Sequence, residues 1–98
     1  MNRVLWVAEL VPGMESTYAK KHAEIWPSMI KLLTQSGVSN YSIHLDGRMV
    51  IGFYDCENMQ LTQEIQNKSE ISAQWNEYMK ECFLSPPRAL HNLVMFLP

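Results

Sequence analysis

The chain has 98 residues, of which 47% are hydrophobic and 18% are charged. This length predicts a single domain over residues 1–98, and this composition is typical of a packed core rather than of a disordered chain. A formal net charge of −2 without a basic run gives no electrostatic basis for binding nucleic acid or an anionic membrane surface, and no apolar run approaches the roughly 20 residues of a membrane span.

The two cysteines bear on the cellular compartment. Cys56 and Cys82 form no CxxC motif and are typical of small apolar residues in a reducing environment. The N-terminal residues run directly into a strand-like segment and lack the layout of a secretory signal. We therefore expect a cytoplasmic protein.

The first part of the chain predicts one strand and one long helix. Residues 3–11 are rich in β-branched and aromatic residues, which is typical of a strand. Residues 15 to about 35 predict a helix, and Gly37 is well placed to end it. A proline inside a helix removes a backbone donor and clashes with the preceding turn, so we expect a kink or a restart at Trp26-Pro27.

The rest of the chain predicts three strands and two helical segments. In chain order these are strand 38–45, strand 49–56, helix 57–66, helix 69–83 and strand 89–97. Asp46-Gly47 predicts a tight hairpin, and Ser85-Pro86-Pro87 predicts an extended loop before the last strand. The order β-α-β-β-α-β is that of an α+β, ferredoxin-like fold, in which helices cover one face of an antiparallel sheet.

The strands indicate that both faces of this sheet are buried. Val4, Trp6 and Ala8 alternate with Leu5 and Val7, whereas a sheet covered on one side carries polar residues on the other. The helices can cover only one face. We therefore expect a homodimer in which a second copy covers the other face, and the alternative is a wide cavity lined by the open face.

Candidate functional residues begin with Tyr18 and His22, one turn apart on the predicted helix, followed by Trp26. An imidazole with an unperturbed pKa of about 6.5 can donate or accept a proton at neutral pH. A phenol beside it can orient a substrate hydroxyl. The alternatives are a structural histidine and a half-buried aromatic residue.

Three further residues are candidates for binding. Tyr41 starts an apolar strand series and either reaches the same space or lies in the core. Trp75 lies on a helical apolar stripe, so it is either a core residue or a plate that stacks on a sugar while the neighbouring Asn76 amide binds hydroxyl groups. The three histidines lie on separate elements without HxH or HExxH spacing, so we expect no metal site.

Three sequence blocks resemble the L-rhamnose mutarotase family. They are Tyr18…His22…Ile25-Trp26-Pro27, the segment Asn40-Tyr41-Ser42-Ile43-His44-Leu45-Asp46, and the C-terminal Val94-Met95-Phe96-Leu97-Pro98. The resemblance implies a dimeric α+β barrel and a cofactor-free epimerase that acts at the anomeric carbon of a sugar. It further implies that His22 is the proton donor and that Tyr18 and Tyr41 bind substrate. Trp75 matches the first of two family tryptophans, and Asn76 replaces the second.

On this resemblance we predict an isomerase that interconverts the α and β anomers of L-rhamnose by general acid–base ring opening. This catalysis typically contributes ~10²–10⁴-fold, which suits a reaction that already proceeds slowly in water. Two alternatives stay open at this point. One is a mutarotase for another 6-deoxy sugar such as L-fucose, and the other is a non-catalytic dimeric module that binds a small ligand.

Overall fold

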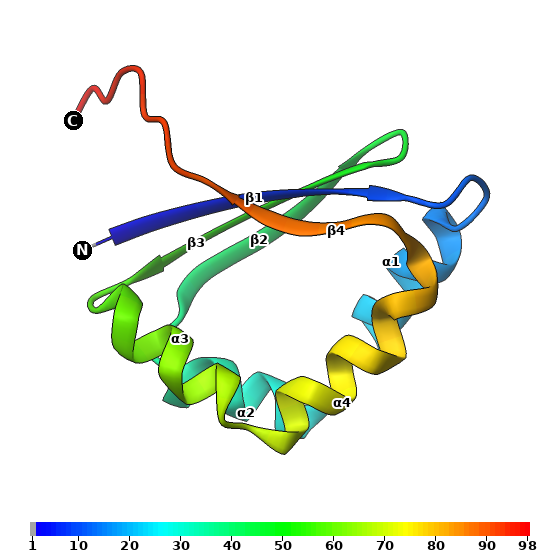
Figure 1. The fold of residues 1–98 in the computed structure, drawn as a ribbon, viewed down its shortest axis with the longest axis horizontal. Coiled ribbons are helices and arrows are strands. Elements are labelled where there is room, and N and C mark those ends of the chain that lie inside the picture. Colours follow the sequence, from blue (N-terminus) through cyan, green and yellow to red (C-terminus); the bar gives the residue numbers. More distant parts are fainter. Residues whose placement is uncertain (1) are drawn as a thin grey trace.

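A computed structural model of the chain describes residues 2–98 and places all helices on one face of a four-stranded antiparallel sheet (Figure 1). Its elements in chain order are β1 (Asn2–Leu10), α1 (Glu15–Ala23), α2 (Pro27–Gln35), β2 (Ser39–Asp46), β3 (Met49–Cys56), α3 (Met59–Asn67), α4 (Glu70–Met79), a 3-10 turn (Lys80–Cys82) and β4 (Phe83–Leu90). This order confirms the predicted ferredoxin-like fold. In residues 2–98, no helix has the length and apolar character needed to cross a bilayer.

The sheet has the strand order β2-β3-β1-β4, so β1 and β3 are its central strands. Alternation along the strands separates an inner face, toward the helices, from an outer face. Val4, Ala8 and Leu10 of β1 and Val50 of β3 lie on the inner face and are buried. The core therefore lies between this face and the helices.

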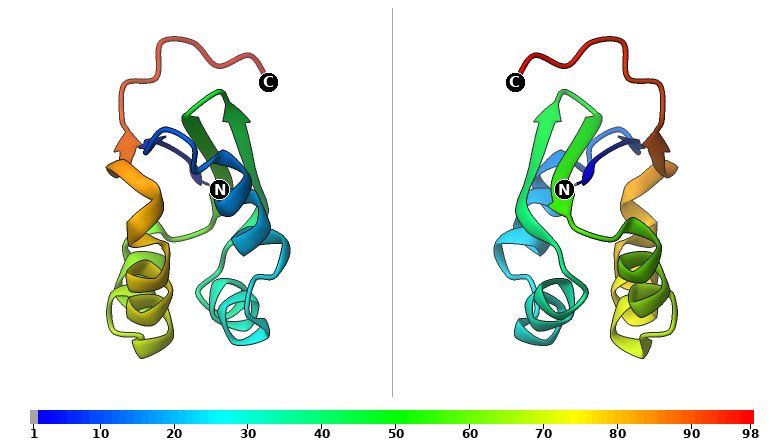
Figure 2. Two further views of the ribbon diagram at one scale, coloured as in Figure 1. Left: turned by 90° about the vertical axis from the view of Figure 1, so that its right-hand side faces the viewer. Right: turned by 90° about the vertical axis from the view of Figure 1, so that its left-hand side faces the viewer.

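The helices form two pairs that flank the space below the sheet. Figure 2 shows α1 and α2 on one side and α3 and α4 on the other. The predicted interruption at Trp26-Pro27 is confirmed as a restart, since Trp26 is extended and Pro27 opens α2. Proline suits this position because the first backbone N–H of a helix has no intrahelical partner. Ser69 and Asn58 cap the two later helices with side-chain hydrogen bonds.

The last strand differs from the prediction. It spans Phe83–Leu90 and contains Ser85-Pro86-Pro87, which the sequence assigned to a loop, whereas residues 91–98 form no strand. Two physical features allow prolines here. β4 is an edge strand, and its register with β1 shifts at the position of the prolines, where no ladder bond requires their missing N–H groups.

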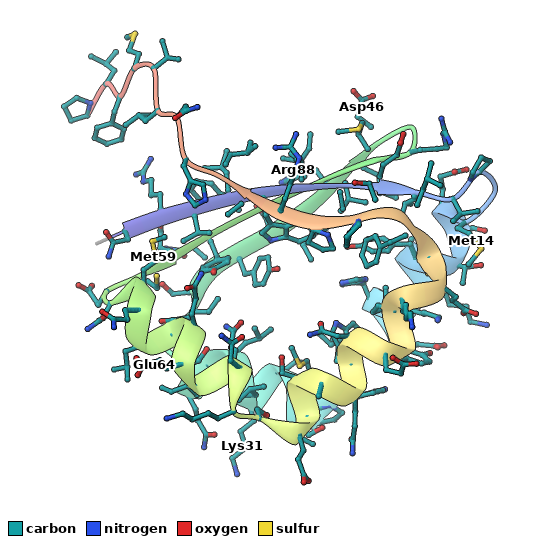
Figure 3. The ribbon with its side chains drawn as sticks, in the orientation of Figure 1. Met14, Lys31, Asp46, Met59, Glu64 and Arg88 are labelled. Atoms are coloured by element: carbon teal, nitrogen blue, oxygen red, sulfur yellow. The ribbon has the colours of Figure 1, made fainter. Side chains whose placement is uncertain are left out.

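The outer face of the sheet carries apolar residues that lack cover within one chain. Leu5, Met49 and Leu90 are exposed there, and the apolar side chains of residues 93–97 are also exposed. Figure 1 shows residues 91–98 on the opposite side of the sheet from the helices. Figure 3 shows Arg88 pointing to this same side, while Lys31 of α2 points away from the sheet at the far end of the molecule.

Candidate active site

A cavity of about 460 Å³ lies between the inner face of the sheet and the helices. This volume is within the usual range for a small-molecule site. All five candidate residues line the cavity, although they come from α1, β2 and α4: Tyr18, His22, Tyr41, Trp75 and Asn76. The fold thus brings together residues that are separated by more than half of the chain, from Tyr18 to Asn76.

His22 has a defined tautomer. Its Nδ1 lies 3.2 Å from the carbonyl oxygen of Tyr18, one turn earlier on α1. Because a carbonyl can only accept, Nδ1 carries the hydrogen, and Nε2 of the neutral ring is left as an acceptor. Burial lowers the pKa of His22, and the bond to the Tyr18 carbonyl partly opposes this shift. At neutral pH the ring is therefore predominantly uncharged.

Aromatic rings enclose His22. The Tyr18 ring lies 4.4 Å from it, and the Trp75 ring meets it edge-on at 5.4 Å. Trp75 is only 7% exposed and packs against Trp26 at 5.1 Å, so it belongs both to the core and to the cavity wall. Trp26 itself supports the wall from behind.

Tyr41 is held from a strand that is not adjacent to its own. The indole Nε1 of Trp6 donates a hydrogen bond to the Tyr41 hydroxyl oxygen at 3.0 Å. Burial raises the pKa of Tyr41 to about 12, against a lowering by the Trp6 bond, and burial likewise raises the pKa of Tyr18. Both phenols therefore stay protonated at neutral pH and can donate hydrogen bonds.

The cavity combines polar groups with electrical neutrality. Among residues 2–98, those that line it include no Asp, Glu, Lys or Arg, and His22 is the lining group that titrates nearest to neutral pH. Such a wall suits an uncharged polar ligand whose hydroxyl groups need partners, and it would disfavour a charged one.

Sequence reasoning missed several lining residues. These are Trp6 and Tyr54 on the sheet and Gln66, Asn67 and Ser72 on α3 and α4. Ser72 could have been found, because it precedes Asn76 by one helical turn and Trp75 by three residues, which puts all three on one face. Trp6 had no such signal, since its partner Tyr41 is 35 positions away.

Comparison with known proteins assigns the family. The family model described as L-rhamnose mutarotase matches residues 3–94. A relative from Bacteroides thetaiotaomicron with that name is 37% identical over 83 residues, which is 83% of this chain and 79% of the relative. Another, from Listeria monocytogenes, is 34% identical over 89 residues, or 89% of this chain and 85% of the relative.

A third relative, from Mesorhizobium japonicum, is 63% identical over 38 residues, and the match spans only 36% of its length. The crystal structure of an L-rhamnose mutarotase from Formosa agariphila has the same fold, with a TM-score of 0.81 at 21% identity over 99% of this chain and 100% of that one. Tetracenomycin F2 cyclase from Streptomyces glaucescens shares the fold at a TM-score of 0.73 and 11% identity. On the family model and the two long matches, the chain belongs to the L-rhamnose mutarotase family.

Proposed function

We propose that this protein is an isomerase that interconverts the α and β anomers of L-rhamnose. The observation that carries the proposal is the neutral, hydroxyl-rich cavity lined by a single uncharged imidazole, His22, together with the protonated phenols of Tyr18 and Tyr41. Family membership supports the choice of sugar. The reaction needs one proton delivered and one removed, which these groups can perform.

The tautomer of His22 suggests the sense of its proton transfer. In ring opening, Nε2 accepts the proton of the anomeric hydroxyl while a tyrosine hydroxyl protonates the ring oxygen and the C1–O5 bond breaks. The aldehyde end then rotates. In ring closure the resulting imidazolium returns its proton to the anomeric oxygen, so His22 acts as the proton donor in that half of the cycle.

Saturation-transfer NMR between the two anomeric protons of the sugar tests this function. His22→Ala should slow the catalysed exchange by roughly 10²–10⁴-fold, because it removes the group that both takes and returns a proton. Lys20→Ala, an exposed neighbour on the same helix, should exchange like the wild type. Wild-type protein that gives no exchange above buffer would exclude the function, and an active His22→Ala variant with a native circular dichroism spectrum would remove His22 from this role.

The identity of the sugar is tested with the same measurement. Asn76 lines the cavity beside Trp75, and its amide can both donate to and accept from a sugar hydroxyl, whereas an indole can only donate one hydrogen bond and stack. Rates for L-rhamnose should exceed those for L-fucose and for sugars that lack the 6-deoxy group. A higher rate for L-fucose would change the assigned substrate, while binding without exchange would identify a non-catalytic module.

We also propose that the protein is a homodimer formed through the outer face of the sheet. A hollow of about 600 Å³ separates this face from the chain end, with Arg3, Leu5 and residues 90–96 among its walls. The exposed apolar residues of this face and of the chain end form a surface of the kind that another chain usually covers, and a second copy has the same surface to bury.

A cytoplasmic location stays a prediction, consistent with two cysteines that are buried and free.

A further inference from the structure

The bond between Trp6 and Tyr41 crosses a strand. Trp6 lies on β1 and Tyr41 on β2, and β3 lies between these two strands in the sheet. The residue of β3 that pairs with Trp6 is Gly52, which also pairs with Ile43 of β2. The indole therefore reaches across Gly52 to meet the hydroxyl.

Gly52 makes this path available. A Cβ atom at position 52 would overlap the edge of the Trp6 indole that carries Nε1. Gly52 is buried and does not have a positive φ, so the close approach of the indole, rather than backbone conformation, explains the glycine. Gly52 thus leaves room for the hydrogen-bonded arrangement of Trp6 and Tyr41 on the sheet side of the cavity.

The arrangement fixes the direction of the Tyr41 hydroxyl. An indole N–H can only donate, so it takes one lone pair of the phenolic oxygen and leaves the phenolic hydrogen for another acceptor. Both Trp6 and Tyr41 line the cavity, where a ligand oxygen can accept this hydrogen. An N–H bonded to this oxygen also stabilises the phenolate that forms when the proton leaves.

We propose that Trp6 is a positioning residue that holds the Tyr41 hydroxyl as the proton donor to the ring oxygen of the sugar. The inference rests on the proposed mutarotation. In ring opening the Tyr41 proton moves to O5 as the C1–O5 electron pair returns to O5, and His22 Nε2 takes the O1 proton as the C1=O1 bond forms. Ring closure reverses each transfer, so Tyr41 and His22 both regain their starting states.

A double-mutant cycle tests whether Trp6 acts through Tyr41. Trp6→Phe keeps a ring but removes the N–H, and it should lower kcat for anomer exchange by about fivefold to tenfold, the effect of one hydrogen bond. Tyr41→Phe should lower kcat by roughly 10²-fold. The double variant should be no slower than Tyr41→Phe alone. If the two losses multiply instead, Trp6 is a structural residue and the inference fails.

Two further measurements keep the test independent of stability. Gly52→Ala should reproduce the Trp6→Phe loss, and only when Tyr41 is present, because the added methyl displaces the indole. The indole ¹H–¹⁵N resonance of Trp6 should move upfield in Tyr41→Phe, while those of Trp26 and Trp75 serve as internal references. An unmoved Trp6 resonance overturns the inference. An inactive wild type overturns the proposed function first, so the two failures are distinct.

Discussion

At the scale of the residue, the site depends on which nitrogen of one imidazole carries hydrogen. The spacing of Tyr18 and His22 predicted that their side chains share a helix face, and the structure places both on the cavity wall. The tautomer follows from a contact of the His22 ring with the helix backbone rather than from the Tyr18 phenol. Spacing alone could not separate these two interactions, since both join the same pair of residues.

The pH dependence of the reaction reports on His22. Burial lowers the pKa of His22 below its usual 6.5, so the neutral, proton-accepting form persists as the pH falls through 6.5. The acid limb of kcat/KM should therefore have its midpoint below 6.5, measured by saturation transfer from about pH 4 to about pH 8. An acid limb at or above 6.5, or a rate that rises on acidification, would contradict the role of Nε2 as the acceptor.

At the scale of the element, one lysine fixes the helix that carries His22. Lys21 of α1 is buried, and its Nζ donates to the backbone carbonyl of Tyr78 at 2.7 Å and to Glu81 Oε1 at 2.6 Å. The ammonium also lies 4.1 Å from the centre of the Tyr78 ring. These bonds join α1 to the last turn of α4, the helix that carries Trp75, and to the 3-10 turn that follows it, and so maintain the distance between the two sides of the cavity.

Replacing this lysine should loosen the helix pairing. Lys21→Met should lower the free energy of unfolding in urea by about 1–2 kcal/mol, because it removes the hydrogen bonds to Tyr78 and Glu81. The loss is no larger because Glu81 is largely exposed and water can solvate it when its partner is gone. Lys20→Met, on the exposed side of the same helix, is the matched control and should change it by less than about 0.5 kcal/mol.

The Lys21–Glu81 pair also predicts how the free energy of unfolding changes with pH. The hydrogen bond to Glu81 raises the pKa of Lys21 in the folded state above 10.5. The contribution to stability is thus complete below 10.5 and is lost as the pH rises through the folded pKa. The difference between wild type and Lys21→Met should shrink in strongly alkaline urea titrations, and a difference that grows there would contradict the assignment.

The four strands also show where sequence patterns predict the structure and where they fail. Strands β1 to β3 followed from β-branched residues and the Asp46-Gly47 turn, because local propensity and burial agree there. For β4 they disagree. Pro86-Pro87 predicted a loop, yet an irregular edge strand does not need their missing N–H groups. The apolar residues 93–97 predicted a strand, yet they form no strand pairing with any part of residues 2–98.

At the scale of the whole molecule, the outer face of the sheet and the chain end remain to be covered. The two-sided apolar pattern of the strands predicted such a face, and the structure leaves Leu5 and Leu90 partly exposed on it. Figure 1 shows the chain end rising from β4 beyond this face, away from the helices. Assembly through it would leave the cavity between sheet and helices free for substrate.

Sedimentation equilibrium tests the dimer. The wild type should have twice the chain mass of 11.4 kDa, and Leu5→Glu should shift the equilibrium toward single chains because a carboxylate would be buried in the interface. Ile30→Glu, at a half-exposed position on α2, is the matched control and should leave the mass unchanged. A wild type that sediments as a single chain at micromolar concentration would exclude this interface.

The passage of the Trp6 indole over Gly52 has a consequence for redesign of the substrate range. The sheet side of the cavity and the helix that carries His22 belong to different layers of the fold, so positions on the sheet can be changed while α1 stays as it is. Positions 6 and 52 share one volume, so a larger residue at 52 displaces the Trp6 indole unless a smaller residue replaces it at the same time. Libraries that vary this pair jointly offer a route to bulkier sugars, with a hydroxyl donor at position 41 as the feature to retain.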